Sequence, residues 1–334
     1  MSSPSDTLRL ALLNPWQHGF PLVREPFATV AAAAGCDTGT ALAAYATLQR
    51  EGTLSRIGGV FGRGAGGAGT LAAMAVPADR LETVAACVDA QPGVNHNYER
   101  EHALNLWFVV TGRDADAVET TVRTIERTTA LPVLRLPMER AYRIDLGFDL
   151  HGRTAQAPMR ATVAAAPVEA ADRPLAALVE AGLPFVARPY DVWAADCGTT
   201  TDALLARLAD WLAHGTLRRF GTVVRHHELG FAANAMAVFD VTAAQVDACG
   251  AALAEEPGVT LAYRRRRAEG WPYNLYAMVH GRDRAAVREV LARAVVRAGL
   301  AHCPQAVLFS TRRFKQTGAR YFRAPHEEAG HAVA

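Results

Sequence analysis

The chain has 334 residues, half of them apolar and a fifth charged, so it can bury a sizeable core divided between two or more domains. No stretch approaches the ~20 apolar residues of a membrane-spanning helix, and residues 1–9 are too polar for a secretory signal peptide, so a cytoplasmic protein is expected. The net charge of +2 gives no general attraction to polyanions, so an anionic ligand must meet a local basic cluster.

Cysteine usage argues against disulfides and structural metal sites. The five cysteines are scattered, odd in number and never spaced as CxxC or as a Cys/His finger. We therefore expect buried free thiols and no bound metal.

The chain is one unit written twice. At an offset of 163 residues the same residue recurs in both halves, as in the pairs Gly19 and Gly182, Gly52 and Gly215, and Arg56 and Arg219. With small insertions the match continues through Tyr98 and Tyr263, Asn105 and Asn274, and Gly112 and Gly281. A match this long indicates a duplication, and we expect the two halves to pack as a pseudo-dimer.

Each half opens with a helical pattern. Over 8–52 and 174–215 apolar residues recur at helical spacing and are interrupted by glycine and proline, which predicts three short helices. The segments that follow, 54–61 and 217–224, read as a strand or wing. The sequence therefore predicts two winged helix-turn-helix units.

The second part of each half predicts an α+β sandwich. In the first half we expect strands at 70–76, 94–98 and 105–110, helices at 79–90 and 114–128, and a final strand. The second half repeats this with strands at 235–239, 259–263, 274–280 and 306–309 and helices at 243–255 and 284–298. The order βαββαβ is that of the ferredoxin-like fold.

The predicted fold class is thus α+β, a tandem repeat of winged helix-turn-helix and ferredoxin-like domains. The helix-turn-helix units are assigned to 1–62 and 174–226, and the ferredoxin-like domains to 63–152 and 227–324. An Ala- and Pro-rich stretch at 153–173 reads as an exposed linker, and 325–334 as a C-terminal tail.

This architecture resembles the leucine-responsive and asparagine-type transcription regulators, so DNA binding is the first alternative. The candidate recognition helices argue against it. Between Thr38 and Glu51 only Arg50 and Glu51 are charged, and the second helix carries two aspartates and one arginine. Base reading and phosphate neutralisation both need more cations than this, so we expect these helices to serve as scaffold.

Two histidine-bearing tracts break the Ala/Leu/Val background, at 94–102 and 219–227. The repeat equivalent of His96 is Leu261, and that of His226 is Arg63, so each half brings a different histidine. If the halves face each other, one site with an imidazole on either side follows. The alternative is that both are ordinary half-buried residues at strand ends.

Strand alternation places Arg225 and His227 on one face and His226 on the other. We favour His226 for the shared site, and the spacing leaves His227 open.

A third tract runs from Tyr263 through four arginines to Trp271, Tyr273 and Asn274. Guanidiniums beside aromatic rings suit a planar ligand with several carboxylates, because arginine pairs with carboxylates bidentately. Arg265 is the strongest of the four, since its repeat equivalent is Arg100. A solvated loop remains the alternative for Arg266 and Arg267.

The runs GFPLVREPF, VNHNYEREHALNLWFVV, RRFGTVVRHHELGFAANAMAVF and WPYNLYAMVHG closely resemble siroheme decarboxylase in its fused two-domain form. The resemblance implies loss of carbon dioxide from the C12 and C18 acetates of siroheme, giving 12,18-didecarboxysiroheme in heme d1 biosynthesis. It implies no added cofactor, since the siroheme iron belongs to the substrate. His96 of the HNY motif and His226 of the RH motif would be the catalytic pair.

A histidine can donate the proton that replaces the carboxyl group or bind the iron, and the sequence does not separate these roles. A non-catalytic heme-binding sensor is a further alternative. The expected partner is siroheme or a related tetrapyrrole, with no membrane, and a homo-oligomer or contacts with neighbouring enzymes of heme d1 synthesis are left open. The residues we expect to bind substrate are Arg56, Tyr98, Arg100, Trp107, Arg219, Arg225, His227, Tyr263, Arg265, Trp271, Tyr273 and Asn274.

Overall fold

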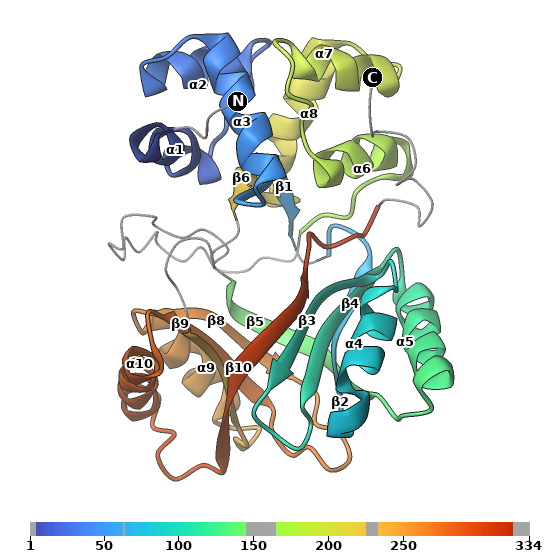
Figure 1. The fold of residues 1–334 in the computed structure, drawn as a ribbon, viewed down its shortest axis with the longest axis vertical. Helices are drawn as coiled ribbons and strands as arrows, with labels where there is room; N and C mark the ends of the chain where they lie inside the picture. The colour runs from blue at the N-terminus through green and yellow to red at the C-terminus, as the bar shows by residue number, and fades with distance from the viewer. Residues whose placement is uncertain (1–4, 63, 145–164, 225–232, 323–334) are drawn as a thin grey trace.

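The structure, a computed structural model, describes residues 5–62, 64–144, 165–224 and 233–322. Figure 1 shows two layers: helices with a small sheet form the upper layer, and a sheet structure flanked by helices forms the lower one. Each layer is built from both halves of the chain, so the predicted pseudo-dimer is confirmed.

The upper layer holds the two helix-turn-helix units, and the prediction of three helices in each is confirmed. Equivalent side chains start the third helix of each unit, where Asp37 accepts a hydrogen bond from the N–H of Thr40 and Thr200 from that of Ala203. None of the described helices is long and apolar enough to cross a bilayer. The helices are α1 (Asp6–Leu13), α2 (Pro26–Ala34), α3 (Thr38–Arg50), α6 (Arg173–Ala181), α7 (Pro189–Asp196) and α8 (Thr201–Ala213), with short 3-10 turns η1 (Pro15–Gln17) and η3 (Ala170–Asp172).

The predicted wing strands pair with each other across the repeat. β1 (Leu54–Phe61) and β6 (Leu217–Val224) form one antiparallel two-stranded sheet in which Gly58 faces Gly221. A side chain at Gly221 would overlap the carbonyl oxygen of Trp16, and one at Gly58 that of Val179. Glycine at both positions therefore lets each strand lie directly against a helical segment.

The lower layer confirms the βαββαβ order in both halves. The first half contributes β2 (Ala68–Met74), η2 (Ala78–Arg80), α4 (Leu81–Asp89), β3 (Val94–Arg100), β4 (Leu106–Gly112), α5 (Ala115–Thr129) and β5 (Leu134–Ile144). The second contributes β7 (Ala233–Phe239), α9 (Val246–Glu255), β8 (Val259–Arg265), β9 (Leu275–Gly281), α10 (Arg284–Arg297) and β10 (Gln305–Gln316).

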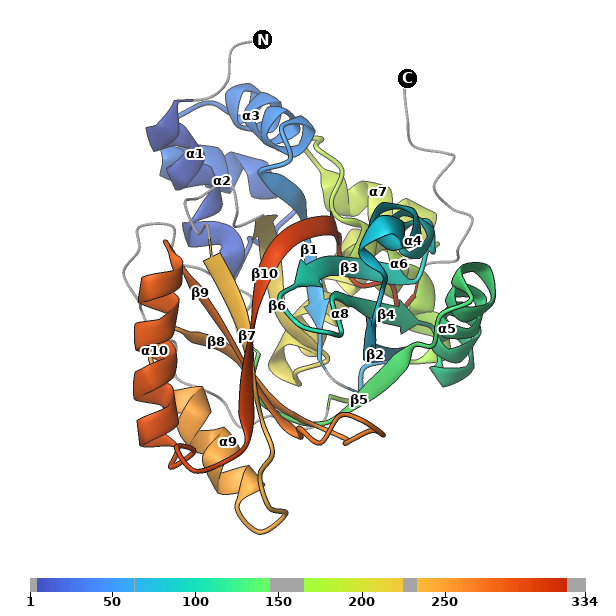
Figure 2. The ribbon, with the colours of Figure 1, turned by 60° about the horizontal axis from the view of Figure 1, so that its bottom comes forward.

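The last strand of each half crosses into the other half. β5 pairs with β2 over 134–137 and then with β8 over 138–144, and β10 pairs with β7 over 305–309 and then with β3 over 310–316. Figure 2 shows β10 running between β7 and β3. The two sheets thereby join into a closed eight-stranded barrel. This exchange makes β10 much longer than the predicted 306–309, because 310–316 find their partner in the other half.

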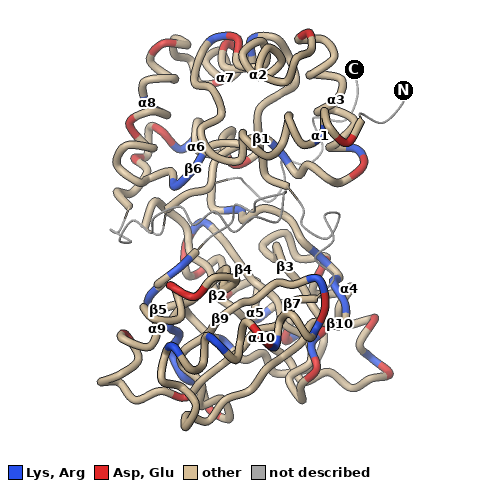
Figure 3. The backbone as a smooth tube through the Cα atoms, turned by 90° about the vertical axis from the view of Figure 1, so that its left-hand side faces the viewer, with Lys and Arg blue, Asp and Glu red and all other residues tan. Residues whose placement is uncertain are grey.

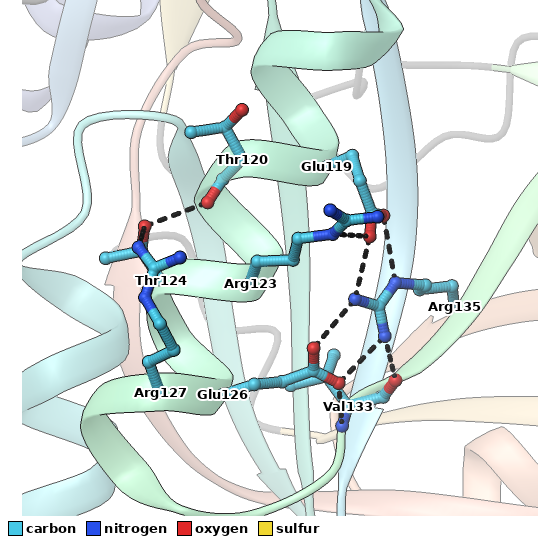
Figure 4. Close-up of polar contacts among 8 residues, drawn as sticks. All are labelled: Glu119, Thr120, Arg123, Thr124, Glu126, Arg127, Val133 and Arg135. Atoms are coloured by element: carbon cyan, nitrogen blue, oxygen red, sulfur yellow. Dashed lines mark hydrogen bonds and ion pairs between the residues drawn. The ribbon is translucent and has the colours of Figure 1, made fainter.

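Side chains hold β5 near both of its ends, and they hold β10 in the part that crosses into the other half. At the start of β5, Arg135 donates hydrogen bonds to Glu119 and Glu126 of its own α5 (Figure 4). Further along β5, Tyr142 donates its hydroxyl proton to Asp247 at the start of α9, in the other half. β10 mirrors this second contact through Arg312, which pairs with Glu82 of α4.

The described end of the predicted exposed linker, 165–173, is largely exposed, but two of its residues are buried. Residues 153–164 lie outside the described residues, but Ala165 and Val168 are buried in the core of the upper layer. The N–H of Val168 donates to the carbonyl of Ala65 (2.6 Å). Their apolar side chains find space beneath the helical layer, so the chain is already packed before α6 begins.

Because β5 crosses to the other half and packs against α9, a glycine-to-alanine substitution in α9 should destabilise the protein instead of stabilising it. Gly250→Ala should destabilise the protein by about 1–2 kcal/mol, although alanine normally favours a helix, because the new methyl group overlaps the ring of Tyr142. Chemical denaturation measures the change. In a Tyr142→Ala background, which removes the ring, the same substitution should be neutral or stabilising. Equal effects in both backgrounds would contradict the packing described.

Candidate active site

Side chains that face the barrel interior form a core separate from those under the helices. Strand alternation sends neighbouring residues to opposite faces, and the inward set is aliphatic and aromatic. Its buried members are Leu71, Ala73, Trp107, Leu136, Met236, Val238, Tyr263, Trp271, Tyr276, Met278 and Leu308.

Three aromatic residues predicted to contact the ligand ring pack against one another beside the loops that follow β3 and β8. The ring centroid of Trp271 lies 5.1 Å from that of Trp107 and 4.9 Å from that of Tyr273. Both indole N–H groups are satisfied within the protein, by the Tyr276 hydroxyl (2.7 Å) and the Leu104 carbonyl (2.6 Å). Trp107, Trp271 and Tyr273 thus close one part of the barrel.

Asn274 also has a structural position. Its amide accepts from the N–H of Val241 and donates to the carbonyl of the same residue (both 2.9 Å). Its repeat equivalent Asn105 binds Val76 in the same way. Each asparagine therefore fixes the turn after the first strand of its barrel half, and its polar groups are already used.

Arg100 and Arg265 occupy equivalent buried positions in the barrel interior, and the exchanged strands hold both. Nη1 of Arg100 donates to the carbonyl of Leu308 on β10 (3.0 Å), and Nη1 of Arg265 to that of Leu136 on β5 (2.6 Å). Arg100 also contacts the side-chain oxygen of Asn234 (3.4 Å). The two arginines, predicted to be equivalent in the repeat, thus occupy equivalent positions in the structure.

Aromatic faces accompany both guanidiniums. Arg265 lies 4.6 Å from the ring centroid of Tyr263, and Arg100 lies 5.6 Å from that of Tyr98. The structure therefore brings together four of the predicted substrate-binding residues, two from each half.

Arg100 carries a buried charge. Among the described residues no Asp or Glu lies within ion-pair distance of it, and its Nε is buried without a hydrogen-bond partner. Burial lowers the pKa of Arg100 to about 10. A guanidinium buried without a counter-ion is costly, so this part of the interior suits an anionic ligand.

His96 lies near the start of β3, on the same strand as Tyr98 and Arg100. Its Nδ1 lies 3.1 Å from the side-chain oxygen of Asn95, and its ring stacks on Tyr98 at 6.2 Å between centroids. Burial lowers the pKa of the His96 imidazole to about 4. The asparagine oxygen only accepts, so Nδ1 carries the proton and Nε2 the lone pair of a neutral ring.

Arg56 and Arg219, the two predicted substrate-binding arginines of the upper layer, differ in how close they lie to His96. Gln316 pairs with His96, and Gly318, two residues later, lies directly against the guanidinium of Arg56. Arg56 therefore lies near the end of the barrel that carries His96. Its repeat equivalent Arg219 is turned into the helical layer, where it donates to the carbonyl of Gln17 (2.9 Å).

The remaining predicted residues, Arg225, His226 and His227, lie outside the described residues, between Val224 of β6 and Ala233 of β7. The predicted meeting of His96 with His226 therefore stays a prediction. Asn234, which binds Arg100, was not among the predicted substrate-binding residues, although it stands in the run RRFGTVVRHHELGFAANAMAVF that resembles the family.

The helical layer carries charges of both signs rather than one basic face. Figure 3 shows acidic and basic positions intermixed along it. Asp202 in the first turn of α8 is paired with Arg24 of the other unit (2.8 Å). A scaffold role for these helices remains our expectation.

Comparison with known proteins follows the same division of the chain. A model of the AsnC-like ligand binding domain matches residues 65–143 and 228–315. A model of the siroheme decarboxylase NirDL-like HTH domain matches residues 10–54 and 172–218. Each domain type is thus recognised twice, once in each half.

Relatives span nearly the whole chain. The siroheme decarboxylase NirDL subunit of Paracoccus pantotrophus is 41% identical, covering 94% of this chain and 97% of its own length. A siroheme decarboxylase of Hydrogenobacter thermophilus is 32% identical over 95% of both chains. The crystal structure of siroheme decarboxylase NirDL with an iron-uroporphyrin III analogue matches with a TM-score of 0.66 and 28% identity, covering 96% of this chain and 95% of that one. The chain therefore belongs to the siroheme decarboxylases, in the form that joins two homologous units in one polypeptide.

Proposed function

We propose that this protein removes the carboxyl groups of the C12 and C18 acetates of siroheme, giving 12,18-didecarboxysiroheme and carbon dioxide in heme d1 biosynthesis. Membership of the family and the tetrapyrrole analogue bound by a solved relative support this proposal. The observation that carries it is the buried guanidinium of Arg100, without a carboxylate partner among the described residues, on the same strand as His96.

The reaction needs a proton and no redox partner. When the bond between the acetate CH2 and its carboxylate breaks, carbon dioxide leaves and the electron pair stays on the CH2 carbon, delocalised into the macrocycle. A proton then converts this carbon into a methyl group. The protein must therefore bind the ring, orient the acetate and supply one proton for each carboxyl group lost.

Arg100 and Arg265 are proposed to bind carboxylates that the substrate retains. A carboxylate is costly to remove from water without a partner, and a guanidinium offers two parallel donors to it. Tyr98 and Tyr263 place ring faces beside these charges. The reacting acetate should lie away from both arginines, because an ion pair would stabilise its ground state and slow the loss of carbon dioxide.

His96 is proposed as the proton donor for one acetate. The free protein holds it neutral, but the carboxylates of a bound tetrapyrrole favour its protonated form and raise its pKa. Binding of the substrate would then protonate His96, and the reaction would consume this proton. One observation favours a second role: with Nδ1 directed at Asn95, Nε2 carries the lone pair that an iron ligand needs.

Replacing His96 tests the assignment. His96→Ala should slow the loss of at least one carboxyl group by about 10²–10⁴-fold, the usual contribution of a positioned acid. Mass spectrometry of siroheme after anaerobic incubation gives the products, with His302→Ala, a change at an exposed residue, as the control. Wild-type formation of the didecarboxylated product by His96→Ala would contradict the role. A bound tetrapyrrole of unchanged mass with the unaltered protein would instead indicate a sensor.

The two roles of His96 differ in the absorption spectrum of bound ferric siroheme. If the imidazole ligates iron, His96→Ala should shift the spectrum. If it only donates a proton, the spectrum of the bound ring should be unchanged while turnover is lost.

Replacing Arg100 separates ligand binding from folding. Arg100→Met should weaken tetrapyrrole binding by about tenfold or more, the value of one hydrogen bond to a charged group, while leaving the melting temperature unchanged or raised. Binding titrations and thermal melts measure the two effects. Arg267→Met, at an exposed arginine paired with Asp240, is the control. Unchanged affinity together with a large loss of stability would show a structural role.

Binding should also take up a proton. The pKa of His96 is about 4 in the free protein and is expected to be higher in the complex, so between these values the affinity should fall as pH rises. Proton uptake on binding is measured in weakly buffered solution from pH 6 to 8. This range lies above the pKa values of the carboxylates, so their titration does not contribute. His96→Gln should remove the uptake. An identical pH dependence in the variant would exclude His96 as the group that titrates.

A further inference from the structure

The chain that follows β10 connects the barrel to the helical layer. Residues 317–322 leave the barrel and rise towards α6 (Figure 1). They start beside His96, because Gln316, the last residue of β10, pairs with it. Phe322, at their other end, packs against the core of the upper layer. We call residues 317–322 the strap, since they join the barrel end that carries His96 to the helices.

The lower end of the strap holds the backbone next to His96. The N–H of Thr317 donates to the carbonyl of Asn95 (2.7 Å), and its hydroxyl donates to the same oxygen (3.4 Å). The side-chain oxygen of Asn95 lies 3.1 Å from Nδ1 of His96. The position of the strap therefore bears on the orientation of the imidazole through a single intermediate residue.

A buried carboxylate of α6 holds the upper end of the strap. The side chain belongs to Glu180, which is 5% exposed. One of its oxygens accepts the N–H of Tyr321 (2.6 Å), and the other accepts that of Phe322 (3.3 Å). Hydrogen bonds to a charged acceptor are stronger than those between neutral groups. Glu180 therefore ties a helix of the second repeat to the strap.

The glycine-rich turn before β2 makes room for the aromatic rings of the strap. A side chain at Gly66 would overlap the ring of Phe322, and one at Gly67 would overlap that of Tyr321. The φ of Gly67 is 70°, a value that other residues rarely adopt. The ring of Phe322 also lies 4.6 Å from that of Phe61 on β1. Both repeats thus contribute to the place where the strap is held.

The carboxylate at this position is not part of the duplicated pattern. The offset that pairs Gly19 with Gly182 makes Gln17 the repeat equivalent of Glu180. Gln17 is also buried, and its amide donates to Asn14 within the helical layer (3.3 Å). A neutral side chain therefore fits this place in the helical unit. A buried carboxylate is costly unless it accepts hydrogen bonds, and the strap supplies two donors.

We propose that Glu180 is a positioning residue for the loss of carbon dioxide. By holding the strap, it keeps Thr317 on the carbonyl of Asn95, and Asn95 keeps the His96 ring in its orientation. The helical layer of the second repeat thereby orients an imidazole of the first, which gives these helices a role that needs no DNA. The inference rests on the proposed function, in which His96 supplies a proton.

The experiment measures whether Glu180 acts through His96. Wild type, Glu180→Gln, His96→Ala and the double variant are incubated anaerobically with siroheme, and mass spectrometry gives the rates of carboxyl loss. Saturating siroheme removes effects on binding, including any through Arg56, against which Gly318 lies. Glu180→Gln should slow the reaction about tenfold or more, because a displaced donor acts less well. In the His96→Ala background the same change should have no further effect.

A matched control and a second readout separate positioning from folding. Glu256→Gln alters another buried glutamate, at the end of α9, where it pairs with Arg293 (3.0 Å). This variant should react at the wild-type rate. Trypsin cleavage after Arg320 reports on the strap without turnover, and it should be faster than wild type in Glu180→Gln but not in Glu256→Gln.

A second variant tests the inference from the other end of the strap if Glu180→Gln does not fold. Thr317→Pro removes the N–H that holds Asn95 and lies outside the helical core, so it should slow the same reaction. Wild-type carboxyl loss in Glu180→Gln, or in Thr317→Pro, overturns this inference alone and leaves the proposed function standing. Slowing by Glu180→Gln that persists undiminished in the His96→Ala background also overturns it. Absence of any carboxyl loss in the wild type overturns the proposed function itself.

Discussion

The exchange of the last strands between the halves organises the rest of the molecule. β5 and β10 each begin in their own sheet and end in the other, which leaves the eight strands without an open edge. The same crossing supplies the carbonyl oxygens of Leu136 and Leu308 that hold Arg265 and Arg100 inside the barrel. Without it, both guanidiniums would lose these backbone acceptors and the shared interior that they occupy.

Within this shared frame the two halves differ in their reactive groups. Arg100 and Arg265, with Tyr98 and Tyr263, are repeated in sequence and in space. The imidazoles are not repeated, since His96 has leucine as its equivalent. In the proposed function, the duplicated residues would serve the fold and carboxylate binding, and the residues that differ between the halves would supply the proton chemistry. A macrocycle with unlike substituents calls for such unequal halves.

The order of elements could be predicted because helical and strand periodicities, read twice in one chain, reinforce each other. Which strands pair with each other could not be predicted from the sequence. Alternation indicates that 54–61 is a strand, but the pairing of β1 with β6 depends on the packing of two units. Residue type alone does not separate ligand contact from packing at Trp107 and Trp271, whose rings contact each other.

In the proposed function, the buried guanidiniums of the barrel bind carboxylates of the tetrapyrrole. A structure of this protein in complex with siroheme tests it most directly. We expect a substrate carboxylate within hydrogen-bond distance of the Arg100 guanidinium, with the macrocycle between His96 and the second half. A ring bound elsewhere, with Arg100 still contacting only Leu308 and Asn234, would contradict it.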